Sequence, residues 1–263
     1  MRIKKYLAVM SSELKNAIVY RGSAWLRAGL DLVMVVLSYL LWSAIFRGAE
    51  TYNGFTLPEM TTYYLLGGIL SSLTQSDGLL YDFSHEIKTG NYAKYMVKPM
   101  SPLVYFVSAS FARALFPILS KGIVLSGAMF LFARYFTPLN PLDVLCALPV
   151  ILLGGVLNML IQFIITMFTF RLTDIGFVFV IHHIVVTFLS GGLIPLNMVF
   201  GEGAAKWVPF SYTIYYPVLL CMGKSDITAA VASLILFVWV IIFWAAGIIL
   251  MRRAPRHFEG VGL

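Results

Sequence analysis

Long apolar stretches alternate with short polar intervals along almost the whole chain. A helix needs roughly 20 mostly apolar residues to cross a bilayer, because no backbone polar group can stay unpaired in the hydrocarbon. Six stretches meet this requirement, and the pattern predicts an all-α integral membrane protein with six transmembrane helices. They run approximately over 24–46, 61–81, 103–132, 142–170, 175–198 and 227–251. Pro117 and Pro149 mark expected kinks in the third and fourth.

A different periodicity precedes the first apolar stretch. Over residues 1–20, apolar side chains recur at spacings of three and four, opposite several lysines, which predicts an amphipathic helix lying in the membrane interface. The alternative is a frayed basic leader, and the segment lacks the uninterrupted apolar core of a signal peptide. The residues in register are Ile3, Tyr6, Leu7, Met10, Leu14, Ala17 and Ile18.

Composition excludes a soluble protein. The 263 residues are 60% hydrophobic and only 12% charged, with a mean hydropathy of +0.86, whereas about a quarter of the residues of a soluble domain are charged. No interval between the apolar stretches is long enough for a soluble domain. We therefore expect one membrane domain over 1–263.

Basic residues indicate the orientation, because lysine and arginine are retained on the cytoplasmic side. With both termini cytoplasmic, the inner segments hold twelve of the 19 basic residues and the outer segments hold four. The net charge of +7 is thus explained by topology and contact with anionic lipid rather than by nucleic acid, which we do not expect as a partner.

The polar interval 82–102 falls on the cytoplasmic side in this topology. Gly90 divides it into two segments, each long enough for a short helix, and Pro99 ends the second. Ser101 and Pro102 are then a cap and a first-turn proline for the third span. Apolar residues among its charges suit a protein interface. The alternative is an ordinary interfacial loop with snorkelling lysines and tyrosines.

This interval carries the pattern E-I-x-x-G-x-Y-x-x-Y-M-x-x-P-x-S-P directly after the second span. Two further matches are "SGGLIPLNMVFGEGAAKWVPFSYTIYYP" and the basic end "GIILMRRAPRHFEGVG". In this order the motifs resemble the ABC-2-type exporter permeases, more narrowly the six-span subfamily of roughly 260 residues. The outer interval 200–226 is longer than the resemblance leads one to expect, and its Gly201, Gly203 and Trp207 suggest a re-entrant element with half-inserted helices.

The resemblance implies a membrane subunit that exports an amphiphilic or hydrophobic substrate across the bacterial cytoplasmic membrane. Two copies of a separate ATPase subunit would drive it, with ATP and Mg²⁺ bound there, and a second permease, identical or related, would complete the pathway. The segment after the second span would be the coupling helix that contacts the ATPase, and its matching residues are Glu86, Ile87, Gly90, Tyr92, Tyr95, Met96 and Pro99. The first, second and fifth spans would line the pathway, with the candidates Met34, Tyr39, Phe177, Phe179, His182 and Phe188.

The sequence also indicates that another polypeptide binds ATP. No G-x-x-x-x-G-K-[ST] phosphate loop occurs, and we expect no cofactor in this chain. The run Leu189-Ser190-Gly191-Gly192 spells the start of the ATPase signature, but it lies deep in an apolar stretch. Its small residues are better explained by close helix packing or a bend.

Ionisable residues inside spans are costly and are therefore candidates for function. Arg27 and Asp31 are spaced i,i+4 and are expected to pair, whereas the partners of Arg113 and Lys121 stay open. His182 and His183 are adjacent, and because adjacent helical residues point about 100° apart we expect only one to face a pathway. We expect no metal site here, because no Cys, Asp or Glu lies at ligand spacing from the two histidines.

Two other classes of function remain as alternatives. A membrane-embedded enzyme would need a nucleophile with a base in one cavity, and Ser126-Gly127 with a distant histidine is the nearest approach. A multi-span scaffold or channel without ATPase coupling needs only the six spans. The two cysteines, Cys146 and Cys221, are expected to be free thiols.

Overall fold

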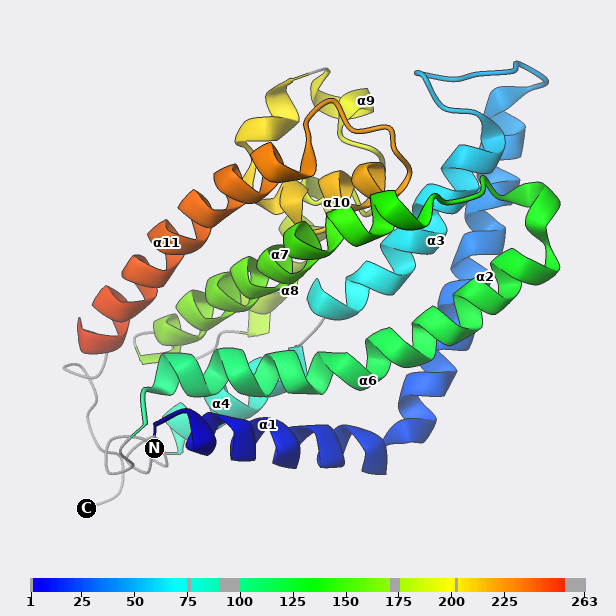
Figure 1. Ribbon diagram of the computed structural model, residues 1–263. Coiled ribbons are helices and arrows are strands. Elements are labelled where there is room, and N and C mark those ends of the chain that lie inside the picture. The colour runs from blue at the N-terminus through cyan, green and yellow to red at the C-terminus, as the bar shows by residue number, and fades with distance from the viewer. Residues whose placement is uncertain (1, 75–76, 90–99, 171–175, 202, 254–263) are drawn as a thin grey trace.

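The structure is a computed structural model that describes residues 2–74, 77–89, 100–170, 176–201 and 203–253 (Figure 1). The described residues are almost entirely helical, with ten α-helices joined by short turns and 3₁₀ segments. The helices are α1 (Arg2–Val19), α2 (Arg21–Phe46), α3 (Leu57–Thr74), α4 (Asp77–Lys88), α6 (Pro102–Leu131), α7 (Pro141–Met167), α8 (Gly176–Leu189), α9 (Asn197–Phe200), α10 (Tyr215–Cys221) and α11 (Ala229–Arg253). The predicted all-α class is confirmed.

Four helical segments among the described residues are long and apolar enough to cross a membrane. They are Arg21–Phe46, Pro102–Leu131, Pro141–Phe170 and Ala229–Arg253, and they correspond to the first, third, fourth and sixth predicted spans. Pro117 and Pro149 lie inside α6 and α7, which continue past them. Six spans are therefore not shown. Four helices of this length and composition indicate a multi-pass membrane protein.

The second and fifth predicted spans are not among these four helices. The second, predicted over 61–81, corresponds to α3 and the first part of α4. The fifth, predicted over 175–198, contains the 14-residue α8, which ends at Leu189. Gly191 has a φ of +82°, in the left-handed region, and Pro195 follows it, so the α-helical hydrogen bonding cannot continue. Hydrophobicity alone does not reveal such a break.

The helices form two groups that meet along α6 (Figure 1). α1 runs alongside the first half of α6, and α2 then turns steeply away and packs against α6 and α3. α7 and α11 pack side by side, with α10 against α7. The predicted helix over 1–20 is confirmed as α1, whereas its position in a membrane interface stays a prediction.

The two largest of four apolar cores among the described residues lie at opposite ends of the molecule. The larger one lies at the end opposite α1 and includes Tyr63, Tyr212 and Tyr216, each with at most 1% of its surface exposed. The second lies at the α1 end and contains Phe83, Phe106 and Phe163, whose rings are 5.5–6.1 Å apart from centroid to centroid. α7 contributes buried residues to both cores, Leu157 and Ile161 to the larger and Leu160 and Phe163 to the second, and thereby joins the two ends.

The interval 200–226 folds as short helices packed on the larger core. It contains 3₁₀ segments at Ala204–Trp207 and Pro209–Tyr212, followed by α10, whose seven residues are all buried. The backbone approaches α7 so closely that a Cβ at Gly154 would lie 2.3 Å from the carbonyl oxygen of Tyr212. The predicted re-entrant insertion of this segment into the membrane stays a prediction.

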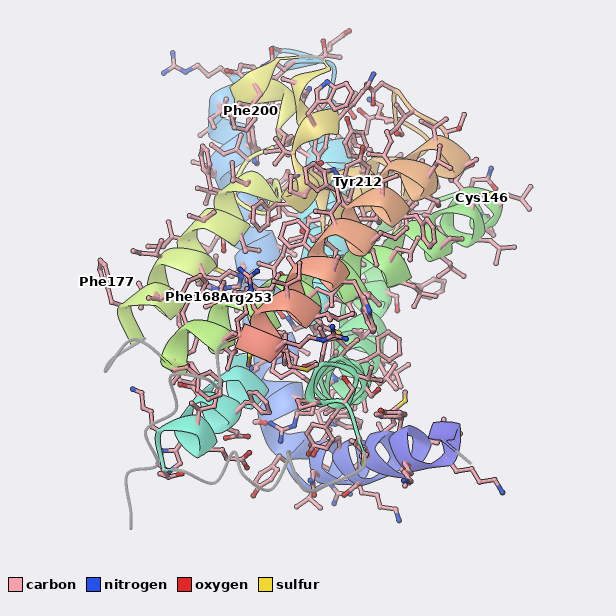
Figure 2. All side chains as sticks on the ribbon, turned by 90° about the vertical axis from the view of Figure 1, so that its left-hand side faces the viewer. Cys146, Phe168, Phe177, Phe200, Tyr212 and Arg253 are labelled. Carbon is pink, nitrogen blue, oxygen red and sulfur yellow. The ribbon has the colours of Figure 1, made fainter. Side chains whose placement is uncertain are left out.

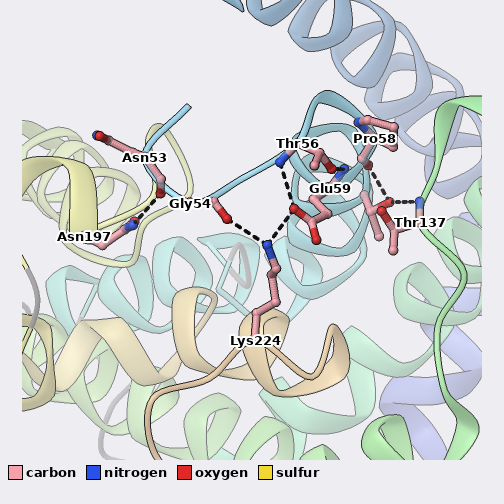
Figure 3. A network of polar contacts seen from close by, with 9 residues as sticks. Asn53, Gly54, Thr56, Pro58, Glu59, Thr137, Asn197 and Lys224 are labelled. Atoms are coloured by element: carbon pink, nitrogen blue, oxygen red, sulfur yellow. Dashed lines mark hydrogen bonds and ion pairs between the residues drawn. The ribbon is translucent and has the colours of Figure 1, made fainter. Parts of the chain in front are cut away.

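A polar network connects the loops at this end (Figure 3). Thr56 and Glu59 form a capping box at the start of α3: the Thr56 N–H donates to Glu59 Oε2 over 2.8 Å, and the Glu59 N–H donates to Thr56 Oγ1 over 3.4 Å. Lys224 Nζ donates to Glu59 Oε2 at 2.6 Å and to the carbonyl oxygen of Gly54 at 2.8 Å. The loop after α10 is thereby joined to the start of α3.

Candidate functional site

A cavity of about 480 Å³ opens between α2, α3, α8 and the turn that follows α8. Its lining is mainly apolar, with a smaller number of hydroxyl, imidazole and carboxylate groups, which is the usual chemistry of a site for a small molecule. The lining residues are Asp31, Met34, Val35, Leu37, Ser38, Leu41, Tyr63, Tyr64, Gly67, Gly68, Ser71, His182, His183, Val186, Thr187, Ser190, Gly192, Leu193 and Ile214.

Two of the six predicted pathway residues, Met34 and His182, line this cavity. The other four lie elsewhere. Tyr39 packs edge-on against Tyr135, and Phe179, 6% exposed, packs edge-on against Tyr81. The remaining two are largely exposed: Phe177 points away from the molecule with 73% of its surface exposed (Figure 2), and Phe188 is 40% exposed.

The turn after α8 closes one end of the cavity. The Tyr63 hydroxyl donates a hydrogen bond to the carbonyl oxygen of Gly191 (2.7 Å), and the Tyr64 hydroxyl donates to that of Leu193 (2.7 Å). A Cβ at Gly191 would lie 2.7 Å from the Tyr63 hydroxyl oxygen. The small residues of this run therefore permit a bend and close packing, as predicted, and the run takes part in shaping the cavity.

A buried ion pair forms part of the wall behind the cavity. Lys121 Nζ on α6 lies 2.8 Å from Asp31 Oδ2 on α2, and only 4% of the Lys121 side chain is exposed. The same ammonium group donates to Ser71 Oγ (2.9 Å) and to the carbonyl oxygen of Gly68 (3.3 Å), both on α3. The prediction that Asp31 pairs with Arg27 was wrong, because the tertiary packing of α6 against α2 brings a better partner to the carboxylate.

Both histidines of α8 line the cavity, whereas the expectation that only one of them faces a transport pathway stays a prediction. The α8 wall comprises positions 182, 183, 186 and 187, a stripe about 140° wide. That arc accommodates two adjacent residues. His182 is 8% exposed, and its Nε2 has no hydrogen-bond partner among the described residues.

At the opposite end, the structure describes only two of the residues assigned to ATPase coupling. Glu86 is partly exposed on α4, whereas Ile87 is 3% exposed and packs in the chain's second core. Gly90, Tyr92, Tyr95, Met96 and Pro99 lie outside the described residues. Ile87 therefore anchors α4 to the rest of the chain. Of these two coupling candidates, Glu86 is the one with exposed surface that a partner could contact.

Next to α4, Arg113 of α6 forms a two-carboxylate network that the sequence did not reveal. Arg113 Nε lies 2.6 Å from Glu13 Oε2 on α1, and Arg113 Nη1 lies 2.9 Å from Asp82 Oδ2 on α4. Glu13 was not singled out, although it lies three residues after Met10 in the apolar stripe of α1. A carboxylate within an apolar stripe predicts a buried ion pair, because a buried acid needs a partner of opposite charge.

Other chemistry is not supported by the described part of the chain. Ser126 donates its hydroxyl hydrogen to the carbonyl oxygen of Gly122, one turn earlier in α6, rather than to a base. Cys146 and Cys221 are free thiols, as expected. No group of three or more His, Cys, Asp or Glu among the described residues could hold a metal ion.

Comparison with protein families gives one match that covers most of the chain. Residues 32–262 match the model of the ABC-2 family transporter protein. No curated protein and no solved structure matched. The matched range includes every residue that lines the cavity except Asp31, together with α4, the polar interval and every predicted site residue. The chain therefore belongs to the ABC-2 family of transporter proteins, whose membrane components are permeases and not enzymes.

Proposed function

We propose that this chain is the membrane-spanning subunit of an ATP-binding-cassette exporter that moves an amphiphilic or hydrophobic substrate out of the cytoplasm or the inner leaflet. The cavity between α2, α3 and α8 is the observation that carries the proposal. Its apolar walls suit the body of such a molecule, while Ser38, Thr187 and His182, whose Nε2 has no partner in the described part of the chain, offer hydrogen bonds to a polar group.

The energy comes from a separate ATPase subunit in two copies, which binds ATP and Mg²⁺. The family implies such a partner, and this chain has no phosphate loop of its own. Contact with the ATPase is made by the polar interval that begins in α4, through Glu86 and the coupling candidates outside the described residues. Because Phe83 and Ile87 fix α4 in the second core, a push on this interval is transmitted into α6 and α7.

A second permease, identical or related, completes the pathway. The cavity is bounded by α2 and α8, and large apolar side chains on both helices are exposed, among them Leu37 and Leu41, which line the cavity, and Ile184. In a membrane these faces meet lipid or another helix. Both termini are proposed to be cytoplasmic, in a bacterial cytoplasmic membrane, because the basic residues are so unequally distributed.

Filling the cavity tests the substrate assignment. The Met34→Trp variant places a bulky ring into the cavity, and Leu40→Trp is a matched control because Leu40 lies on α2, is 55% exposed and does not line the cavity. The complex with the ATPase is reconstituted in liposomes and screened with a panel of neutral and charged amphiphiles for stimulation of ATP hydrolysis. We expect Met34→Trp to abolish stimulation and Leu40→Trp to retain it. Equal responses of the two variants would contradict the assignment.

Coupling is tested at the polar interval. Glu86→Lys combined with Gly90→Val should leave expression and monodispersity normal but abolish ATPase association or its response to substrate. Glu50→Lys, an equal charge change at an exposed position far from α4 along the chain, is the control. Wild-type export by the Glu86/Gly90 variant would show that the interval is only an interfacial loop.

A further inference from the structure

The contacts of α1 point to a role beyond anchoring the chain at a membrane surface. We infer that α1 is part of the coupling apparatus and holds in place both described ends of the polar interval, Asp82 in α4 and Ser101 at the start of α6. This inference rests on the proposed function of the interval. Its evidence is two independent polar contacts and one apolar contact, all made by α1.

The first contact secures the beginning of the interval. Arg113 binds Glu13 of α1 and Asp82 of α4 with two different nitrogens, at 2.6 and 2.9 Å. Glu13 is 8% exposed, so its carboxylate depends on this guanidinium for charge compensation. Hydrogen bonds between ionised groups are about twice as strong as neutral ones. α1, α4 and α6 are therefore joined by one charged node.

The second contact secures the end of the interval. The Ser101 N–H donates to the Tyr6 hydroxyl oxygen of α1 over 3.1 Å. Ser101 is the N-cap residue of α6, and its side chain forms no capping hydrogen bond, which differs from the predicted capping role. A helix start leaves backbone N–H groups without intrahelical partners. Tyr6, two turns before Glu13, supplies an acceptor at the junction where the interval ends.

An apolar contact lies between these two. Val9, on the same face of α1 as Tyr6 and Glu13, packs against the second core, which contains Phe83 and Ile87 of α4. The positions 6, 9 and 13 follow the helical repeat. One face of α1 thus reaches the beginning of the interval through Arg113, packs against its apolar support and contacts its end directly. A helix that served only as a membrane anchor would not need a buried carboxylate on this face.

The arrangement has a mechanical consequence. If the ATPase displaces the interval, α4 and the start of α6 move together with α1, because the Arg113 node joins α4 to α1 and the Tyr6–Ser101 hydrogen bond joins the start of α6 to α1. The displacement then reaches α2, which begins two residues after α1 ends and forms one wall of the cavity. In this inference Glu13 and Tyr6 are positioning residues that act through Asp82, Arg113 and Ser101.

Hydrogen–deuterium exchange of the purified full-length chain in lipid nanodiscs tests the contacts. Glu13→Gln removes the charge and Tyr6→Phe removes the hydroxyl. The matched controls are Glu50→Gln and Tyr20→Phe, at exposed positions. We expect exchange in peptides of α4 to be about tenfold faster for Glu13→Gln, because a charge-assisted hydrogen bond changes an opening equilibrium by at least that order. Tyr6→Phe should accelerate exchange at the start of α6.

A double variant distinguishes a specific network from general loosening. If Glu13 acts through Arg113, adding Glu13→Gln to Arg113→Gln should cause little further acceleration in α4. Full additivity would contradict the inference, and so would unchanged exchange in both single variants.

The last measurement uses the complex with the ATPase. Glu13→Gln and Tyr6→Phe should keep ATPase association but lower substrate-stimulated hydrolysis, whereas both controls should match the wild type. Faster exchange with fully normal stimulation would overturn the inference and leave the proposed function intact. Failure of the wild-type chain to associate with an ATPase would instead overturn the proposed function, and the inference with it.

Discussion

Replacing Lys121 by Met should weaken the attachment of α2 to α6 and α3. The substitution retains most of the apolar stem but removes the ammonium group that lies 2.8 Å from Asp31 Oδ2 and donates to Ser71 Oγ. Removing one member of a buried ion pair costs about 3–5 kcal/mol. Because 25% of the Asp31 side chain is exposed at the cavity, part of that cost is relieved, and we expect a loss of about 2–3 kcal/mol in the free energy of unfolding.

Thermal unfolding of the purified chain in detergent measures this loss. For a chain of this size each kcal/mol corresponds to about 2–4 °C, so the apparent Tm should fall by about 5–10 °C. The double variant Lys121→Met with Asp31→Leu removes both charges and should recover most of the difference, because replacing a buried pair by apolar residues is often neutral. Lys15→Met, at an exposed position on α1, serves as the control and should leave the Tm within about 1 °C, as surface substitutions do.

The two variants together decide whether charge compensation is the cause. If the double variant is as unstable as Lys121→Met alone, the loss comes from packing of the stem and not from an unpaired carboxylate. A Tm of Lys121→Met equal to that of the wild type would show that the pair contributes nothing to the attachment of α2.

Three further predictions concern the end opposite α1. Burial by itself would raise the pKa of Glu59, but hydrogen bonds from Lys224 and from the capping box, with the Lys224 charge, lower it below its ordinary value of 4.5. The resulting stability is complete above that value and is lost as the pH falls through the lowered pKa, so Glu59→Gln should reduce the Tm at neutral pH and not in strong acid. Gly191→Ala, at φ +82° against a neighbouring hydroxyl, should destabilise by about 1–3 kcal/mol, whereas Gly127→Ala, in a helix with open space around it, should stabilise by about 0.5–1 kcal/mol in chemical unfolding. A single cysteine at Asn53, in a chain without its natural thiols, should react with an impermeant reagent added outside the cell, and labelling only from the cytoplasmic side would refute the topology.

The family and the all-helical class could be predicted from sequence because both depend on local information. The length of an apolar stretch indicates whether a helix can cross a bilayer, and this criterion located the four long apolar helices within a few residues. The stripe in residues 1–20 likewise predicted α1. The second and fifth predicted spans are not shown by the same criterion. In the fifth, α8 ends at Leu189 because the left-handed backbone of Gly191 interrupts a helix whose hydrophobicity continues.

Tertiary structure alone decided the partners of the buried charges and the residues that share a cavity. Asp31 has a basic residue one turn away in sequence, yet it pairs with Lys121, 90 positions later, because α6 packs against α2. Aromatic residues such as Phe177 and Phe179 are indistinguishable from cavity residues by composition, but one points outward and the other packs in the core. Glu13 gains its importance only because Arg113 is placed beside it. Hydrophobicity acts residue by residue and can be read along a chain, whereas ion pairs and cavities depend on distances between helices that only the packed structure determines.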